Sequence, residues 1–348
     1  MASGNTIQLK RIAQEASVSI GTVSRVLSNK AQVSDKTRKR VLQVAKDLDY
    51  RPNRLVHAIQ TGKTKTVGVL LKSSQEVHSK ILMGIQEELY DRDHLALTIH
   101  GRKIDPKRPE VTNELQLLQR FVEHRVDGII ICPMEDRTPD DAIREPWMPS
   151  LPMVSVDRRL PGTNVDFVGI DDLAGARQVM DYLFELGHRR IAHITGPSNF
   201  STWALRRQGY EQAMRDRGLT PRVEVDPDHL CGLEQARRLL SGEDRPSAIF
   251  VSSDLLAMAV YQAAAELGLS IPDDLSVAGF ADMRFASLVT PALTSVKQFP
   301  EQVGKRAVAM MFDRMDGKFP EGQPQSICLE PELVVRQSCA PLKTKYPL

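Results

Sequence analysis

Residues 12–27 read IAQEASVSIGTVSRVL, and this stretch decides the fold of the N-terminal region. Apolar residues in and just before it recur at spacings of three and four, which predicts two short amphipathic helices. These helices would bury Leu9, Ile12, Ala13 and Ala16, and then Val23, Val26 and Leu27. Between them, the Ser19 hydroxyl can accept an otherwise unpaired backbone N–H at the start of the second helix. The stretch therefore predicts a helix-turn-helix, whose second helix lies in the DNA major groove.

A small helical hairpin inside a larger core is the alternative interpretation, and two features argue against it. Gly21 falls within the second helix, where glycine costs on the order of 1 kcal/mol relative to alanine, which suggests that a partner approaches the backbone there. A further helix follows, with a start signal at Ser34 and a cluster of positive charge at residues 36–40. Together these features favour binding to nucleic acid.

The charge distribution separates a basic head from an acidic body. The 348 residues are 41% hydrophobic and 26% charged, with a net charge of +2. Residues 1–62 hold 11 Lys/Arg and 4 Asp/Glu, a net charge of +7, which leaves −5 for the rest of the chain. Such an asymmetry is expected if only the head meets phosphate. The length itself indicates a small module and a two-lobed body.

The cysteines indicate a reducing compartment. The polar N-terminus shows no signal peptide and no apolar stretch reaches the length of a membrane span, so we expect a cytoplasmic protein. None of the cysteines has Cys-x-x-Cys spacing, which predicts reduced thiols. They are Cys132, Cys231, Cys328 and Cys339, and Cys132 lies in an apolar run typical of a core.

Three motifs extend the helix-turn-helix pattern. They are Ala13-x-x-Ala16-x-Val18-Ser19-x-x-Thr22-Val23-Ser24-Arg25-Val26-Leu27-x-Asn29, Val33-Ser34-x-x-Thr37-Arg38 and Asp49-Tyr50-Arg51-Pro52-Asn53. With these motifs the chain resembles the lactose-repressor (LacI/GalR) family of bacterial transcription factors. The resemblance implies a homodimer that binds a pseudo-palindromic operator, with a periplasmic-binding-protein-like effector domain behind the DNA-binding headpiece.

Within the headpiece, we expect Ile20, Gly21 and Arg25 at base edges. Arginine can bond guanine bidentately, and an apolar side chain can contact a thymine methyl group. Phosphate contacts position the protein without specifying sequence. The candidates for them are Thr22, Ser24 and Asn29, with Lys36, Arg38 and Lys39.

Residues 51–60 are the next informative segment, because a helix this short is only marginally stable alone in water. A linker with incidental apolar residues is one interpretation. The resemblance instead implies a hinge helix that orders on the operator and drives a wedge side chain into the minor groove. The wedge position falls on Ile59, where the family usually has Leu, and Val56-His57 replaces its usual Ala-Arg. Tyr50, Asn53 and Leu55 complete the predicted DNA-binding set.

Beyond a polar linker, apolar runs without alternation predict buried parallel strands. They lie at residues 66–71, 95–99, 127–132, 153–156, 167–170, 190–195, 247–251 and 275–280. Helical patterns separate them, which indicates open α/β sheets, and the units are too many for one sheet. We therefore predict an all-α helix-turn-helix headpiece with a hinge helix, followed by an α/β effector domain of two parallel-sheet, Rossmann-like lobes.

The domain bounds follow from these runs and from the resemblance. Headpiece and hinge would span residues 7–62, and the effector-binding and dimerisation domain 66–340. The family implies that the chain crosses between lobes near Arg158, near Thr290 and before Leu333. The N-lobe would hold residues of about 66–158 and 292–325, and the C-lobe those of about 160–290 and 328–340.

Ligands of open α/β sheets bind beyond the carboxyl ends of the strands, so residues just after predicted strands are candidate contacts. The segment from Asp171 to Tyr210 again resembles the family's regulatory domain. That resemblance implies that Arg206 clamps effector oxygens and that Asp157 and Ser253 bond sugar hydroxyls. A structural role is the alternative to effector contact for two aspartates: Asp157 could stabilise a turn, and Asp254 could cap a helix. The predicted effector-binding set is Ser73, His78, Asp157, Arg206, Ser253 and Asp282.

Two departures from the family pattern bear on the effector. Residues 279–282 read Gly-Phe-Ala-Asp where sugar- and purine-binding members commonly have Gly-Tyr/Phe-Asp-Asp. Val77-His78 replaces the usual aromatic pair after the first strand. A cleft that loses a carboxylate and gains a histidine near Arg206 tolerates negative charge better. We therefore expect a sugar acid or a sugar phosphate rather than a neutral sugar.

Three other classes of protein are disfavoured. The sequence contains no P-loop, no Gly-x-Gly-x-x-Gly, no zinc-ligand spacing and no Gly-x-Ser-x-Gly motif, which argues against an enzyme. No cofactor or metal is expected. A transport solute-binding protein would need an export signal and would lack the basic head. An architectural DNA-binding protein would not need a two-lobed body. The prediction is a homodimeric, effector-controlled regulator, most simply a repressor; the C-terminal tail has no leucine heptads, which disfavours a coiled-coil tetramer.

Overall fold

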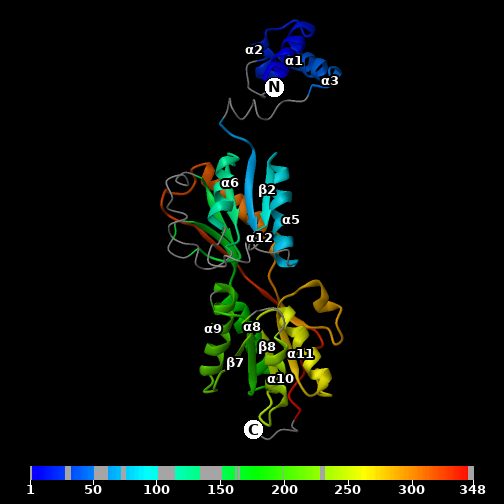
Figure 1. Cartoon of the computed structure of the whole chain (residues 1–348), viewed down its shortest axis with the longest axis vertical. Helices are drawn as coiled ribbons and strands as arrows, with labels where there is room; N and C mark the ends of the chain where they lie inside the picture. Colours follow the sequence, from blue (N-terminus) through cyan, green and yellow to red (C-terminus); the bar gives the residue numbers. More distant parts are fainter. Residues whose placement is uncertain are drawn as a thin grey trace. The chain divides into compact units, whose positions relative to one another are not determined.

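The computed structural model describes residues 2–27, 33–50, 62–71, 76–100, 114–133, 151–160, 163, 165–198, 200–227 and 232–343. The chain divides into two compact units, Met1–Lys65 and Thr66–Leu348 (Figure 1). Within the described ranges, no helix is both long enough and apolar enough to cross a membrane.

The first unit, called the head below, contains helices α1 (Ala2–Glu15), α2 (Ile20–Leu27) and α3 (Asp35–Asp47). Ser17 has a positive φ of 53°, which turns the chain between α1 and α2, and Ser19 Oγ accepts the Thr22 N–H at 3.1 Å. The predicted helix-turn-helix is therefore confirmed. The helices share one core of Ile12, Ala13, Ala16, Val23, Val26, Val41 and Ala45.

The second unit, called the body, contains two six-stranded sheets (Figure 1). The N-lobe sheet has the order β11-β5-β4-β3-β1-β2, and all of its pairings are parallel. Its strands are β1 (Thr66–Leu71), β2 (Leu95–His100), β3 (Gly128–Ile131), β4 (Met153–Val156), β5 (Asp166–Ile170) and β11 (Ser326–Leu329). Helices α5 (Glu76–Asp91) and α12 (Pro300–Met315) cover one face, and α6 (Glu114–Glu123) covers the other.

The C-lobe sheet has the order β12-β10-β9-β8-β6-β7, with only β12 antiparallel to its neighbour. Its strands are β6 (Ile191–Thr195), β7 (Arg222–Val225), β8 (Ala248–Val251), β9 (Ser276–Ala281), β10 (Thr294–Lys297) and β12 (Glu332–Val334). Helices α8 (Asp172–Glu185) and α9 (Ser201–Arg215) pack on one face. Helices α10 (Leu233–Ser241) and α11 (Asp254–Glu266) pack on the other, and a 3-10 helix η1 (Arg284–Ser287) follows β9. The predicted two-lobed parallel fold is confirmed.

The predicted lobe bounds differ from the two sheets at each of the three crossings. β5 pairs with β4, so the first crossing follows Ile170 rather than Arg158. β10 pairs with β9, so the second follows Lys297 rather than Thr290, and α12 rather than β10 returns the chain to the N-lobe. β11 also belongs to the N-lobe sheet, so the third crossing lies between Leu329 and Glu332, after the predicted start of the C-lobe segment at about residue 328.

The start of the head also differs from the predicted bound at residue 7. Helix α1 begins at Ala2, although its apolar spacing begins only at Leu9. The reason is physical: apolar spacing reports which part of a helix is buried, not where its backbone begins.

Candidate functional site

The outer face of α2 carries three of the predicted base-contacting residues. Ile20, Gly21 and Arg25 are exposed, whereas Val23 and Val26 on the opposite face are buried in the head core. Ile20 is 42% exposed on this face. The helix thus presents a mixed apolar and cationic surface of the kind that reads base edges.

Gly21 is not required by the packing of the head. A Cβ atom built at this position would lie 3.7 Å from Ser19 Oγ and 3.8 Å from Arg25 Nη2, which is ordinary contact distance. Its φ is not positive either, so no backbone strain calls for glycine. The head therefore tolerates a side chain at this position.

The remaining predicted DNA-binding residues fall into three groups. Thr22 helps to close the start of α2, because its Oγ1 lies 2.9 Å from Ser19 Oγ, and Ser24 is half-buried in the same helix. Tyr50 packs against the head core, so the packing of the head is enough to explain its position. Asn29, Asn53, Leu55 and Ile59 lie outside the described residues, as does the predicted hinge segment.

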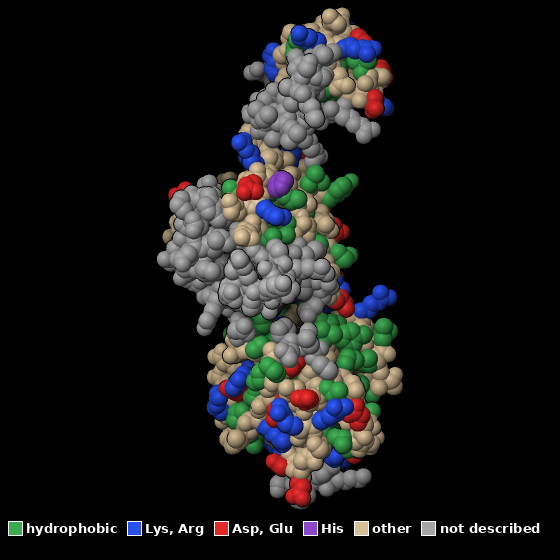
Figure 2. Space-filling view, in the orientation of Figure 1, with side chains coloured by type: hydrophobic (Ala, Val, Ile, Leu, Met, Phe, Trp, Pro, Cys, Tyr) green, Lys and Arg blue, Asp and Glu red, His purple; other side chains and the backbone are tan. Residues whose placement is uncertain are grey.

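A second candidate surface is apolar and lies on the body. Met83 and Tyr90 on α5 are 61% and 82% exposed, and Leu95 at the start of the edge strand β2 is 56% exposed. Leu288, which ends η1 in the C-lobe, is 71% exposed. Figure 2 shows hydrophobic side chains gathered along the flank that carries α5. Large exposed apolar side chains that gather in this way mark interaction surfaces.

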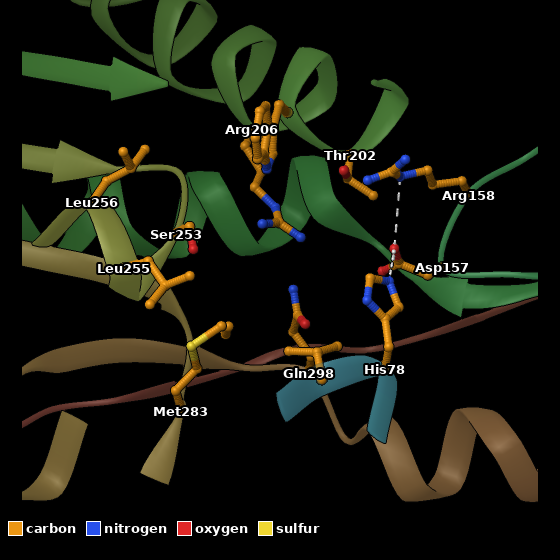
Figure 3. Close-up of a pocket in the computed structure, with 13 residues that line it drawn as sticks. His78, Asp157, Arg158, Thr202, Arg206, Ser253, Leu255, Leu256, Met283 and Gln298 are labelled. Carbon is orange, nitrogen blue, oxygen red and sulfur yellow. Dashed lines mark hydrogen bonds and ion pairs between the residues drawn. The ribbon is translucent and has the colours of Figure 1, made fainter. Parts of the chain in front are cut away.

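A cavity lies between the two lobes at the carboxyl ends of their strands (Figure 3). Four predicted effector residues line it: His78 near the start of α5, Asp157 after β4, Arg206 on α9 and Ser253 after β8. The structure thus brings together side chains from both lobes at the place where open α/β sheets bind ligands.

Arg206 is held rigidly at the cavity wall. Its Nε donates to Asp172 Oδ1 at 2.7 Å, its Nη1 donates to the Ser252 carbonyl at 2.7 Å, and its guanidinium lies 3.9 Å from the centre of the Phe280 ring. Burial raises the pKa of Asp172 to about 6, although Arg206 opposes this shift. A guanidinium fixed on three sides needs little further ordering to bind an oxyanion.

His78, Asp157 and Cys132 form a buried cluster at the other wall. His78 Nε2 lies 3.4 Å from Asp157 Oδ2 and 3.4 Å from Cys132 Sγ. Burial alone would lower the pKa of His78, but Cys132 and Asp157 outweigh burial and raise it to about 10. Burial would likewise raise the pKa of Asp157, whereas His78, Arg158 and Arg206 lower it to about 2. Asp157 also has a positive φ of 64°, which aspartate tolerates better than most residues.

Two aspartates do not behave as the sequence suggested. Asp282 does not line this cavity but a neighbouring pocket, which it shares with Glu76 and Lys80 of the N-lobe. Its carboxylate accepts a hydrogen bond from Arg336 Nη2 at 2.6 Å. Asp254 is the first residue of α11 and not its cap. Its carboxylate accepts the Ser295 hydroxyl at 2.6 Å and the Met283 N–H at 2.7 Å, which ties α11 to the strands beside it. Ser73 lies outside the described residues.

Several cavity residues lie outside the predicted effector-binding set, although Arg158 and Ala281 follow predicted strands and Val77 precedes the predicted His78. Arg158 directly follows Asp157, and Trp203 precedes Arg206 by one helical turn on α9. Gln298 follows the carboxyl end of β10, a strand that the apolar pattern did not reveal. The other lining residues outside that set are Val77, Thr202, Leu255, Leu256, Ala281 and Met283.

The chain is similar to known regulators over nearly its whole length. Residues 8–53 match the family described as bacterial regulatory proteins, lacI family, and residues 180–339 match a periplasmic binding protein-like domain. The Ribose operon repressor of Escherichia coli (strain K12) is 31% identical over 335 residues, which cover 95% of this chain and 99% of that protein. The HTH-type transcriptional regulator DegA of Bacillus subtilis (strain 168) is 33% identical, with 96% and 98% covered.

Solved structures give the same picture. The lac repressor dimer bound to operator and the anti-inducer ONPF is 25% identical, has a TM-score of 0.81, and aligns over 94% of this chain and 98% of its own. A complex of the transcriptional regulator CelR with cellobiose is 29% identical, with a TM-score of 0.69 and 95% and 99% covered.

Proposed function

The chain belongs to the lacI family of bacterial regulatory proteins, and we propose that it is a homodimeric repressor whose operator binding is controlled by an acidic, carbohydrate-related effector. It is a transcriptional regulator and not an enzyme. Operator binding would place it in the cytoplasm, where bacterial DNA lies. The observation that carries the proposal is that one chain contains both features. Helix α2 has an exposed face, and the two-lobed body has a polar cavity at the ends of its strands.

The DNA-reading part of the proposal assigns base contacts to Ile20, Gly21 and Arg25. All three are exposed on one face of α2, and the packing of the head does not require glycine at position 21. Arg25 would bond a guanine, Ile20 would contact a thymine methyl group, and Gly21 would let a base edge approach the backbone. Residues 51–60 are proposed to form the hinge helix on the operator.

Selection of bound sequences from a random DNA pool tests this part. The wild-type protein should enrich a two-fold symmetric site, and Arg25→Ala should relax one base preference at symmetric positions in both half-sites. Arg11→Ala is the matched control, because Arg11 pairs with Glu15 at 3.2 Å on α1 and is not assigned to a base. Arg11→Ala should leave the preferred sequence unchanged. A site without two-fold symmetry, or one that Arg25→Ala does not alter, would contradict the proposal.

The dimer is proposed to form through the exposed apolar side chains of the body. Met83, Tyr90 and Leu95 offer a surface on the N-lobe, and Leu288 offers one on the C-lobe. The lac repressor structure, which is a dimer on its operator, provides the precedent in a relative. Two heads joined in this way would read two half-sites of a pseudo-palindrome.

The proposed effector class follows from the charges around the cavity. His78, Arg158 and Arg206 are cationic groups at its walls, and Ala281 stands where many relatives are expected to carry an aspartate. Arg206 is already paired with Asp172, and Arg158 and His78 share Asp157. These three cationic groups outnumber the two carboxylates, which favours a ligand carboxylate or phosphate. Among relatives, one structure holds cellobiose and one curated relative is a ribose operon repressor, which supports a carbohydrate-related skeleton.

Calorimetric titration with sugar acids and sugar phosphates, beside neutral hexoses of matched size, tests the effector class. The acids should bind, and Arg206→Lys should weaken them by at least about tenfold, because lysine keeps the charge but loses the guanidinium fork. Arg207→Lys is the matched control, since Arg207 bonds Glu211 at 2.7 Å and does not line the cavity. Binding of the neutral sugars alone would overturn the proposed class.

Coupling between the two sites needs an effector that binds two states of the body unequally. The cavity is lined by His78 and Asp157 from one lobe and by Arg206 and Ser253 from the other. A ligand that contacts both pairs would favour the arrangement in which they are close together. This would shift the spacing of the two hinge segments in the dimer, and with it the affinity for the operator.

A further inference from the structure

Three potential metal ligands that are far apart in the sequence meet at the N-lobe wall of the cavity. His78, Cys132 and Asp157 come from three segments that follow the adjacent strands β1, β3 and β4. His78 and Cys132 are 54 positions apart, and Cys132 and Asp157 are 25 apart. The separations are 3.4 Å from Nε2 to Oδ2, 3.4 Å from Nε2 to Sγ and 3.9 Å from Sγ to Oδ2.

One of these distances, from His78 Nε2 to Asp157 Oδ2, is long for a hydrogen bond between buried charged groups. A charge-assisted N–H···O bond is about 2.7–2.9 Å, and Arg206 and Asp172 on the opposite wall reach 2.7 Å. The His78–Asp157 separation is 3.4 Å although both side chains are largely buried and oppositely charged. The His78–Asp157 pair is therefore looser than the buried Arg206–Asp172 pair.

The same distances suit a tetrahedral ion. Zinc takes nitrogen and oxygen ligands at about 2.0–2.1 Å and thiolate at about 2.3 Å, so its ligand atoms stand about 3.3–3.6 Å apart. Two of the three separations fall within this range, and the Sγ–Oδ2 separation exceeds it by only about 0.3 Å. A small rotation of the Cys132 side chain would close that difference.

We propose that His78, Cys132 and Asp157 form a three-ligand site for Zn²⁺ or a similar divalent transition-metal ion, with its fourth position open to the interlobe cavity. The donor set of one imidazole, one thiolate and one carboxylate suits zinc and disfavours Mg²⁺ and Ca²⁺, which prefer oxygen. His78 and Asp157 line the cavity whereas Cys132 does not, so the thiolate holds the ion from behind. All three ligands belong to one lobe, so the site does not depend on closure of the cavity.

A bound metal ion would also balance the negative charges of the cluster. A divalent cation would take the place of the proton on His78 and neutralise the Asp157 carboxylate and the Cys132 thiolate. The Arg206 and Arg158 guanidinium groups would remain positive beside the fourth position. An anionic oxygen ligand is the group that such a position would accept.

Titration of the metal-stripped, reduced full-length protein with Co²⁺ tests the site. Cobalt bound to a thiolate gives a near-ultraviolet charge-transfer band, and tetrahedral cobalt gives strong visible bands. We expect about one Co²⁺ per chain, displaced by Zn²⁺. Cys132→Ser should abolish the charge-transfer band, whereas Cys328→Ser, which alters an exposed thiol outside the cluster, should leave it unchanged. No band, or a band that survives in Cys132→Ser, would overturn the site.

Asp157→Asn provides a second variant if Cys132→Ser folds poorly, since asparagine also tolerates the positive φ of this position. It should keep the thiolate band but weaken Co²⁺ affinity by at least about 10–100-fold, the loss seen when even outer partners of metal ligands are removed. Unchanged affinity would overturn the assignment of Asp157. Both readings are made without DNA or effector, so a failure here would leave the proposed operator and effector binding intact.

Discussion

Two glycines show how one residue type serves opposite purposes in this chain. A Cβ at Gly196 would lie 1.5 Å from the Trp203 ring, so glycine is needed there for Trp203 to reach the cavity wall. A Cβ at Gly21 would meet only ordinary contacts. Gly196 is thus fixed by the fold, whereas Gly21 weakens α2 without any gain to the head. The proposed approach of a base edge to α2 would account for Gly21.

Gly21→Ala is accordingly expected to change stability and DNA binding in opposite directions. Alanine should raise the free energy of unfolding of the head by up to about 1 kcal/mol, because it favours the helix. Its methyl group should weaken binding to the selected operator, because it fills the space proposed for a base edge. Urea unfolding and fluorescence anisotropy measure the two quantities. A stabilised variant with unchanged operator affinity would show that no group approaches Gly21.

At the scale of elements, the sequence predicted what depends on strong apolar patterns. The central strands and the helices of both lobes were found, because each buries a continuous run or a clear helical stripe. β7, β10, β11 and β12 were missed, since they are only three or four residues long and lack a continuous apolar run. β10 is largely buried, but it reads Thr-Ser-Val-Lys. Gln298 was missed with β10, which shows how an overlooked strand also hides a cavity residue.

The cluster of His78, Cys132 and Asp157 was out of reach for a different reason. Zinc motifs are recognised by ligands a few residues apart, but these ligands are brought together by strand order. Only the adjacency of β1, β3 and β4 in the sheet places their following residues side by side. The sequence could predict each loop as part of a cavity rim, but not which rim residues would touch.

The crossing of α5 and α12 is the tightest helix contact of the N-lobe among its described elements. A Cβ at Gly84 would lie 2.1 Å from the Glu301 carbonyl oxygen, and one at Gly304 would lie 2.2 Å from the Ile81 carbonyl oxygen. Both obstacles are backbone atoms, which cannot swing aside as a side chain can. The two glycines therefore set the distance at which these helices cover the sheet.

Gly84→Ala should destabilise the body by about 1–3 kcal/mol, because overpacking against backbone outweighs the better helix propensity of alanine. Gly242→Ala is the control: its φ is −81° and no atom lies within 4 Å of the added Cβ. That change should stay within about 0.5 kcal/mol. Urea unfolding followed by circular dichroism compares the two. Equal effects would mean that the crossing can relax at little cost.

For the whole molecule, a buried aspartate and a buried histidine should change the free energy of unfolding in opposite directions as pH changes. Burial raises the pKa of Asp254 to about 6, despite its bonds to Ser295 and Met283. Burial lowers the pKa of His193 to about 3, despite its bond to the Phe250 carbonyl. The aspartate contributes stability that is present at low pH and is lost as pH rises through 6. The histidine contributes stability that is present above pH 6.5 and is lost as pH falls.

Single substitutions should separate these contributions. Between pH 7.5 and pH 5, protonation of Asp254 should stabilise the wild-type body by about 1 kcal/mol, and Asp254→Asn should lack this gain. Over the same interval, His193 should lower the free energy of unfolding of the wild type by about 2 kcal/mol, and His193→Gln should lack this decrease. Unfolding free energies at the two pH values give both differences. Shifts of the same sign in the two variants would contradict the assignment.

The three lobe crossings have a consequence for synthesis of the chain on the ribosome. The core of the head is complete once α3 has emerged, because every residue of that core lies before residue 51. The N-lobe sheet is not complete until β11 has been made, and the C-lobe sheet not until β12 has been made, both close to the C-terminus. Chains grow at about 5–20 residues per second, so many seconds separate the two events. A ribosome-bound intermediate would therefore carry a finished DNA reader before it possesses any means of sensing an effector.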